Sequence, residues 1–373
     1  MCMFFHFPCR YCVRSLEGML SSGEGSGFVP SVEEIQAYKE RPPILATIEL
    51  VDGNIIAEDL PITPDFTVGK VLEICTGWLD LKDHRANMFG IFVYDLGETD
   101  ESSSQDDPYS NAAFAGLPRT PRPLKNDDFM GDVIVQKSRQ KRKYKFVMKK
   151  KIYLPQHNWR GNDPHYERLI YLQAEDEAII KGNIPFEEER QVIELSCISF
   201  AVAFGADFPT TVDEMIQNNV TDFIMPSWRN KRSAEDWAGI ILKNRNRLLE
   251  TDTGDLQEEF IKILSESQVY GTHWFYVRKV TNAPAIITSF PDELLLGFNN
   301  VGMHAYNLNR KLLASFAYAD IYRWGGSASQ FSLIIWDANI KDSFELIVST
   351  SQAADMAASI LDHIRAIMST EEA

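Results

Sequence analysis

Hydrophobic and polar residues alternate along residues 44–62, on both sides of the pair Asp52-Gly53. A period of two indicates strands with one buried face, and an Asp-Gly pair between them is typical of a hairpin turn. The spacing then becomes helical after Thr67, a residue type that caps helices. The apolar positions of this helix are Val68, Val71, Leu72, Cys75, Trp78 and Leu79. Residues 87–96 return to a strand pattern.

The strand pattern of this first region is interrupted by a polar segment and resumes after it. Residues 97–121 are polar and rich in turn-forming residues, which predicts an exposed insertion. The pattern resumes at Pro123 and closes on a strand within residues 144–155. Hairpin, helix and strand in this order predict a ubiquitin-like α+β lobe.

The middle of the chain is helical, and its last third is made of strands. Between His165 and Tyr270 the apolar positions recur at helical spacing, and one helix begins with the capping pattern Ser233 to Asp236. After Gly271, short alternating segments with turns between them predict strands. A final helix has one apolar face, made by Ala353, Ala357, Ile360, Ile364 and Ile367. Many strands followed by one helix predict a PH- or PTB-like sandwich.

The composition of the chain argues against several classes of function. The chain of 373 residues has a formal net charge of −16, which argues against nucleic acid as a partner because phosphates repel an acidic surface. No apolar run reaches the length of a membrane span, and the N-terminus lacks the pattern of a secretory signal. Five cysteines suit a reducing cytosol better than a disulfide framework. Phosphate-binding loops, zinc-protease motifs and nucleophile elbows are all absent from the sequence, so no enzymatic activity is expected.

The N-terminus holds Cys2, His6, Cys9 and Cys12 within a dozen residues. Four such ligands could converge on zinc, but no second pair or turn motif accompanies them. Alternatively, the cysteines act as small hydrophobic residues on one face of a helix that begins near Pro8. We expect the helix, and therefore no metal and no cofactor.

Three segments resemble the FERM module, in the order in which that family has them. Residues 169–185 (LIYLQAEDEAIIKGNIP) are similar to the start of its helical lobe, and residues 144–155 (YKFVMKKKIYLP) to the last strand of its first lobe. Residues 320–337 (DIYRWGGSASQFSLIIWD) are similar to the fifth and sixth strands of its third lobe, particularly in talin and unconventional myosins. The resemblance implies a multidomain α+β fold: a ubiquitin-like lobe, an acyl-CoA-binding-protein-like helical lobe, and a PH/PTB-like sandwich with a C-terminal helix.

The resemblance also implies domain boundaries. The segment YCVRSLEGML resembles the last helix of the myosin tail homology domain that directly precedes a FERM module in myosins, which implies a truncated helix rather than a metal site. The expected divisions are residues 1–20 for that helix, 21–42 for a linker, 43–155 for the first lobe with its insertion 97–121, 160–269 for the helical lobe, and 270–370 for the third lobe.

The third lobe is where the resemblance places partner binding. Its fifth strand and C-terminal helix would frame a groove to which an extended peptide adds as a further strand. The implied contact residues are Ile321, Tyr322, Arg323, Trp324, Gly325, Gly326, Ser327, Ala353, Ala357 and Ile360. Strand alternation predicts Tyr322 and Trp324 on one face and Arg323 on the other. Ordinary burial of the two aromatic residues in the sandwich is the alternative interpretation.

Residues 137–151 form a basic run in an otherwise acidic chain. Its cations could contact anionic headgroups, since each contributes about 1 kcal/mol near such a membrane. The residues concerned are Lys141, Arg142, Lys143, Lys149, Lys150 and Lys151. The alternative is a strand with Tyr144, Phe146 and Met148 in the core and its lysines in water, so we expect only weak membrane binding.

The resemblance implies a non-catalytic adaptor: the cargo-binding tail of an unconventional myosin, or a membrane–cytoskeleton linker. Expected partners are cytoplasmic tails of membrane proteins, other cargo peptides and cytoskeletal proteins. The expected location is the cytoplasm, at the cytoskeleton or the inner membrane surface. Two alternatives remain: a peripheral membrane protein that binds phosphoinositides, and the tail of a FERM-containing kinesin. The chain ends just after the last helix, which favours the myosin order over the kinesin one.

Overall fold

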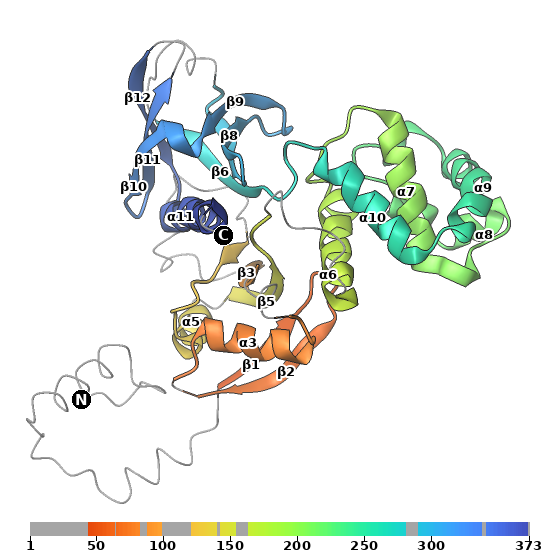
Figure 1. Cartoon of the computed structure of the whole chain (residues 1–373), viewed down its shortest axis with the longest axis horizontal. Helices are drawn as coiled ribbons and strands as arrows, with labels where there is room; N and C mark the ends of the chain where they lie inside the picture. The colour runs from red at the N-terminus through yellow and green to blue at the C-terminus, as the bar shows by residue number, and fades with distance from the viewer. Residues whose placement is uncertain are drawn as a thin grey trace, which may run out of the picture. The chain divides into compact units, whose positions relative to one another are not determined.

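A computed structural model describes residues 44–63, 65–82, 88–98, 121–139, 142–153, 163–280, 290–337 and 341–371. These residues fall into two compact units (Figure 1). The first lies within Met1–Leu79, Gly90–Ser103 and Pro123–Met148, and the second within Asp80–Phe89, Ser104–Arg122 and Lys149–Ala373. The N-terminal cysteines with His6, the linker 21–42, residues 99–120 of the insertion, and Lys141 lie outside the described residues.

The first unit is built on a mixed sheet. Its strands are β1 (Ile44–Glu49), β2 (Ile55–Ile62), β3 (Phe89–Glu98), β4 (Arg122–Pro123) and β5 (Arg142–Lys150), in the order β2-β1-β5-β3-β4. β1 pairs antiparallel with β2 and parallel with β5. The helices are α3 (Val68–Trp78) and α5 (Met130–Arg139). This arrangement confirms the ubiquitin-like α+β lobe.

Local sequence explains most of these elements. Gly53 adopts φ +83°, in the region that favours glycine, and the Leu50 carbonyl accepts a bond from its N–H at 3.1 Å. The connection is nevertheless longer than the two-residue turn that Asp52-Gly53 predicts, because β1 ends at Glu49 and β2 begins at Ile55. Thr67 caps α3 as predicted, by accepting a bond from the Lys70 N–H at 3.2 Å. Trp78 departs from the predicted apolar face, since it is 58% exposed.

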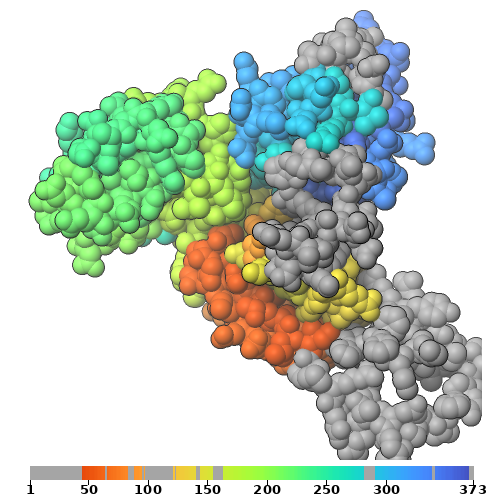
Figure 2. Space-filling model, turned by 180° about the vertical axis from the view of Figure 1, so that it is seen from behind, coloured from red at the N-terminus to blue at the C-terminus, as the bar shows by residue number. Residues whose placement is uncertain are grey.

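The second unit begins with helices. They are α6 (Pro164–Glu175), the π-helix η2 (Asp176–Ile180), α7 (Glu189–Phe204), α8 (Val212–Gln217), α9 (Ala234–Glu250) and α10 (Thr253–Ser265). Short 3-10 turns lie between them at Gly205–Asp207 (η3), Val220–Phe223 (η4) and Arg229–Lys231 (η5). Ser233 caps α9 as predicted, by accepting a bond from the Asp236 N–H at 3.1 Å. In the space-filling view these helices form one closely packed, green body (Figure 2).

A seven-stranded antiparallel sheet follows, in the order β10-β11-β12-β6-β7-β8-β9. The strands are β6 (His273–Lys279), β7 (Glu293–Phe298), β8 (Gly302–Tyr306), β9 (Leu312–Ala317), β10 (Ile321–Gly326), β11 (Gln330–Asp337) and β12 (Asp342–Ser349), with a 3-10 turn η6 (Tyr318–Asp320) before β10. The last helix, α11 (Ala353–Glu371), lies against β10 and β11 (Figure 1). Buried residues of the sheet and of α11 share one core. The predicted sandwich with a C-terminal helix is thereby confirmed.

Across the described ranges, no helix combines the length and the hydrophobicity that crossing a bilayer requires.

Candidate partner-binding groove

Strand β10 lies at one end of the seven-stranded sheet. It pairs with β11 along one edge, and the described residues place no strand along its other edge. An open strand edge presents backbone N–H and C=O groups that a further strand can pair with. The helix α11 lies beside β10, so the predicted groove would lie between this open edge and the helix.

A bulge changes which side chains of β10 share a face. Ile321 lies opposite Ile335, but Arg323 lies opposite Ile334, so one residue, Tyr322, is extra. Tyr322 is 64% exposed and Arg323 is also exposed, while Ile321 is buried and Trp324 packs against the core. The predicted pairing of Tyr322 with Trp324 on one face is therefore wrong. The predicted exposure of Arg323 is confirmed.

The two glycines of β10 differ in their surroundings. A Cβ added at Gly326 would lie 2.5 Å from the Cβ of Ala353 and 2.8 Å from the Gln330 carbonyl oxygen. At Gly325 a Cβ would have no atom within 4 Å. Gly326 thus gives room to α11 and not to a partner, whereas the space at Gly325 is open. Ser327 belongs to the turn after β10, where its Oγ accepts a bond from the Gln330 N–H at 3.2 Å.

The helix side of the groove has a buried and an open face. Ala353 and Ile360 are buried in the core, like Ile321, so these three leave no side-chain surface for a partner. Ala357 is half-buried at the core margin. Leu361 is 37% exposed and Arg365 is exposed. The sequence predicts one apolar face for this helix, but it cannot show which of those residues are covered by the sheet.

Two exposed arginines of this lobe, one on β10 and one on α11, have no ionic partner among the described residues. Arg323 of β10 and Arg365 of α11 take part in no ion pair or hydrogen bond formed by their side chains within the described part of the chain. An exposed cation that the fold leaves uncompensated is available to an acidic group from outside.

Unlike these arginines, the lysines at the end of the basic run have partners inside the molecule. Lys149 pairs with Glu177 at 3.5 Å, Lys150 is buried and donates to the Tyr166 hydroxyl at 2.8 Å, and Lys151 pairs with Asp362 at 3.4 Å. The expectation of solvated lysines is wrong for these three, because long side chains at the end of β5 reach partners that are distant in sequence. Lys143 is exposed, as expected.

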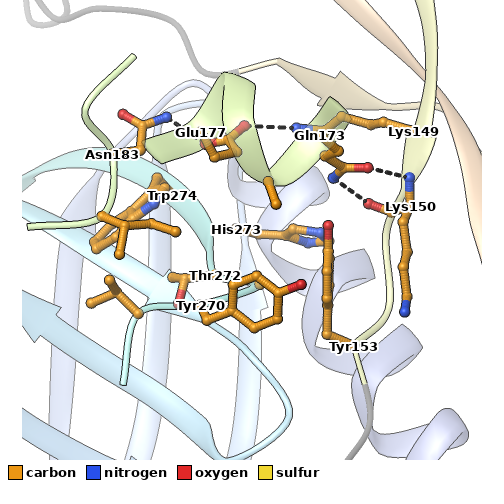
Figure 3. Close-up of a pocket in the computed structure, with 14 residues that line it drawn as sticks. Lys149, Lys150, Tyr153, Gln173, Glu177, Asn183, Tyr270, Thr272, His273 and Trp274 are labelled. Carbon is orange, nitrogen blue, oxygen red and sulfur yellow. Dashed lines mark hydrogen bonds and ion pairs between the residues drawn. The ribbon is translucent and has the colours of Figure 1, made fainter. Parts of the chain in front are cut away.

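A small polar cavity is lined in part by Lys149 and Lys150 (Figure 3). Its volume is about 30 Å³, which gives room for one or two water molecules, and Gln173, Glu177, Tyr270 and His273 contribute to its lining. Burial lowers the pKa of His273 well below 6.5, and the neighbouring His363, Lys149 and Lys151 lower it further. In the described ranges no three His, Cys, Asp or Glu side chains converge as metal ligands would. Sequence reasoning missed this cluster because its members come from separate elements.

The helices contain a buried carboxyl group at Glu175. Its Oε1 accepts bonds from the Tyr171 hydroxyl at 3.0 Å and from the Ser199 hydroxyl. Burial raises the pKa of Glu175 above 4.5, and these two bonds oppose that shift. This pattern is one of internal packing, away from the groove.

Two family models match the second unit in sequence. The FERM central domain matches residues 158–275, and the PTB domain of the IRS-1 type matches residues 280–368. Among curated proteins, FERM domain-containing protein B of Dictyostelium discoideum is 22% identical over 46% of the chain and 36% of its own length. Kinesin-like protein KIN-14E of Arabidopsis thaliana is 21% identical over 91% of the chain and 26% of its own length. The chain thus spans roughly a third or less of these relatives.

Solved structures share the fold across nearly the whole chain. The MyTH4-FERM MF2 domain of Dictyostelium discoideum myosin VII (mutant 1) has a TM-score of 0.67 at 15% identity, covering 95% of this chain and 69% of that one. The C-terminal MyTH4-FERM domain of human myosin 7b, solved with the harmonin-a PDZ3 domain, has a TM-score of 0.64 at 16% identity and covers 96% and 67%. Residues 158–275 thus match the FERM central domain, and the fold of the chain is similar to that of MyTH4-FERM domains of myosin VII.

Proposed function

We propose that this chain is a non-catalytic adaptor module that binds an extended peptide as an added strand along β10. The observation that supports this most directly is the open edge of β10 beside α11. Main-chain hydrogen bonds would supply much of the affinity, as in other cases of strand addition. FERM domains are generally non-catalytic protein-binding modules, which agrees with the absence of enzymatic motifs from the sequence.

The side chains at the groove suggest the partner's character. Tyr322 offers an exposed aromatic surface, and Arg323 offers a cation that has no partner among the described residues. A peptide with acidic groups, such as a cytoplasmic tail of a membrane protein or a cargo peptide, would satisfy both. Cytoskeletal proteins are further candidate partners, and the proposed location is the cytoplasm at the cytoskeleton. FERM-fold neighbours have been solved with protein partners, namely harmonin-a PDZ3 for myosin 7b and the C-terminal domain for Drosophila merlin.

For the larger protein, we propose the tail of an unconventional myosin. Five myosin VII MyTH4-FERM structures with TM-scores from 0.62 to 0.67 support this through the fold. A FERM-containing kinesin is the alternative, supported by the match to KIN-14E over 91% of the chain. Sequencing the transcript on both sides of the present chain distinguishes them: a motor domain upstream supports the myosin, and one downstream supports the kinesin.

Phosphoinositide binding at the inner membrane surface is the second candidate for the module itself. The intramolecular contacts of Lys149, Lys150 and Lys151 count against it, since these cations already have partners. Lipid binding through the remaining basic residues would weaken steeply with salt, whereas a strand-addition complex would tolerate salt.

Peptides selected from a displayed library against the wild-type chain provide the test. Arg323→Glu should weaken their binding about tenfold, because it reverses a charge at the groove without burying it. Lys311→Glu is the matched control: Lys311 is exposed in the same lobe but next to β9, at the opposite end of the sheet. The melting temperature should stay the same in both variants.

A second arm tests the strand itself. Peptides N-methylated at alternate positions cannot donate main-chain hydrogen bonds, so one of the two methylation phases should abolish binding while the other leaves it largely intact. Binding that survives Arg323→Glu and both phases of methylation, or that fails with Lys311→Glu, would place the site elsewhere.

A further inference from the structure

Residues 149–153, here called the strap, comprise the last two residues of β5 and the three that follow. Most of them form a contact with a different element. One side chain, that of Gln173, forms hydrogen bonds with both the N–H and the carbonyl group of Lys150. The Lys150 N–H donates to Gln173 Oε1 at 2.8 Å, and Gln173 Nε2 donates to the Lys150 carbonyl at 3.0 Å (Figure 3). Gln173 is buried in α6, so both bonds are sheltered from water.

The side chains of the strap reach three further places. Lys149 pairs with Glu177 of η2, and Lys150 donates to Tyr166 of α6. Tyr153 packs so closely on Gly271 that a Cβ there would lie 2.7 Å from its ring. Gly271 adopts φ +70°, so both its conformation and its neighbour exclude a side chain. The strap is therefore fixed firmly to α6, η2 and the connection before β6.

The strap also holds α11. Lys151 Nζ lies 3.4 Å from Asp362 Oδ2, and the neighbouring His273 of β6 contacts the same part of α11. The His273 ring bonds Ser359 Oγ through Nδ1 at 3.0 Å, and it packs edge-on against the ring of the buried His363. One helical turn of α11, residues 359–363, thus meets the strap and β6 together.

We propose that the strap is a conformational device that sets the position of α11 and thereby the width of the groove beside β10. The sheet core holds α11 through Ala353, Met356 and Ile360. The strap holds the following turn through Asp362, and His273 of β6 holds it through Ser359. Release of the strap would leave the C-terminal half of α11 attached through the core and His273 alone, and freer to move relative to β10. The groove part of this inference rests on the proposed function, whereas the hold on α11 does not.

Hydrogen exchange of the full chain, measured without any partner, tests the hold on α11. Lys151→Met removes the ion pair and keeps the apolar stem, so amides of residues 359–368 should exchange about fivefold faster. Lys145→Met is the matched control, since Lys145 pairs with Glu49 at 3.1 Å in the same basic run but in the first unit. The charge-swapped double variant Lys151→Asp/Asp362→Lys should restore slow exchange.

The outcomes separate the two proposals. Unchanged exchange in both Lys151→Met and Asp362→Asn, a milder change at the other partner, would overturn the strap. Where the Lys151→Met chain fails to fold, Asp362→Asn decides in the same way. A library-selected peptide should bind Lys151→Met with an affinity at least about threefold lower than that for the wild type, because the looser α11 occupies the binding conformation less often. Faster exchange with unaltered peptide affinity would refute coupling to the groove, whereas Arg323→Glu should weaken the peptide and leave α11 exchange as it was.

Discussion

Replacement of Gly326 by alanine should push α11 away from β10, and replacement of Gly325 should not. Neither glycine is among the residues with positive φ, so the backbone of each accepts a Cβ without strain. The difference lies in space. The Cβ of Gly326→Ala would come within 2.5 Å of the Ala353 Cβ, but that of Gly325→Ala would meet no atom within 4 Å.

The size of the effect follows from this geometry. Two carbon atoms are in comfortable contact at about 3.5–4.0 Å, so α11 must retreat by about 1 Å or more. Overpacking of this kind costs about 1–3 kcal/mol, while Gly→Ala in a strand is otherwise stabilising by about 0.5–1 kcal/mol. The Gly→Ala gain is common to both variants, so they should differ by the overpacking cost of about 1–3 kcal/mol in the free energy of unfolding of the second unit. That corresponds to melting temperatures about 2–12 °C apart.

The assay is thermal unfolding combined with hydrogen exchange of α11. Gly326→Ala should lower the melting temperature and speed exchange near residue 353, and Gly325→Ala should do neither. Ala353→Gly removes the opposing methyl group at the start of the helix, so the double variant Gly326→Ala/Ala353→Gly should regain the part of the loss that this contact causes, while the 2.8 Å approach to the Gln330 carbonyl oxygen remains. Equal effects of the two glycine variants, or no recovery in the double variant, would refute the close contact as the reason for Gly326.

Two predictions concern pH. Burial lowers the pKa of His273 and His363 below 6.5. The free energy of unfolding that depends on their neutral forms is therefore complete above that pH, and it declines as the pH falls from 6.5 through the lowered values. Urea unfolding from about pH 7 to about pH 5 should show a shallower decline in stability for His363→Gln than for the wild type, and an equal slope would contradict this. Burial raises the pKa of Glu175 above 4.5, so its charged form costs stability at neutral pH and the cost disappears as the pH falls towards 4.5. Glu175→Gln keeps an acceptor for Tyr171 and Ser199, and it should raise the urea midpoint near neutral pH; equal destabilisation at every pH would argue against a raised pKa.

Much of the fold could be predicted from local sequence. Thr67 and Ser233 cap helices where they were expected, and the alternation around Gly53 forms a hairpin. These features depend on neighbours a few residues apart, so the sequence contains their cause. The order of the lobes and the exposure of Arg323 also agree with expectation.

The groove's details depend on tertiary contacts that no local pattern contains. The bulge at Tyr322 reverses the faces of the residues before it, and neither Tyr322 nor its neighbours differ from an ordinary strand sequence. Gly326 accommodates Ala353, which is 27 positions later in the numbering of the chain, and this is visible only once α11 is placed. Lys149, Lys150 and Lys151 look solvated in sequence because a run of lysines usually is, but their partners lie on separate elements.

These contacts separate the cations that maintain the fold from those that can act outside it. In a chain of net charge −16, most exposed acidic groups repel an acidic partner at a distance, so general attraction cannot bring such a peptide to the surface. A strand-addition site does not require this long-range attraction, because its main-chain hydrogen bonds form only on contact and salt weakens them little. In the proposed complex Arg323 would have a local role: it would favour peptides that place an acidic group beside β10, while other acidic surfaces stay repelled. The proposed strap would complement this selectivity, since Lys151 pairs with Asp362 inside the molecule and would thereby fix α11 beside β10.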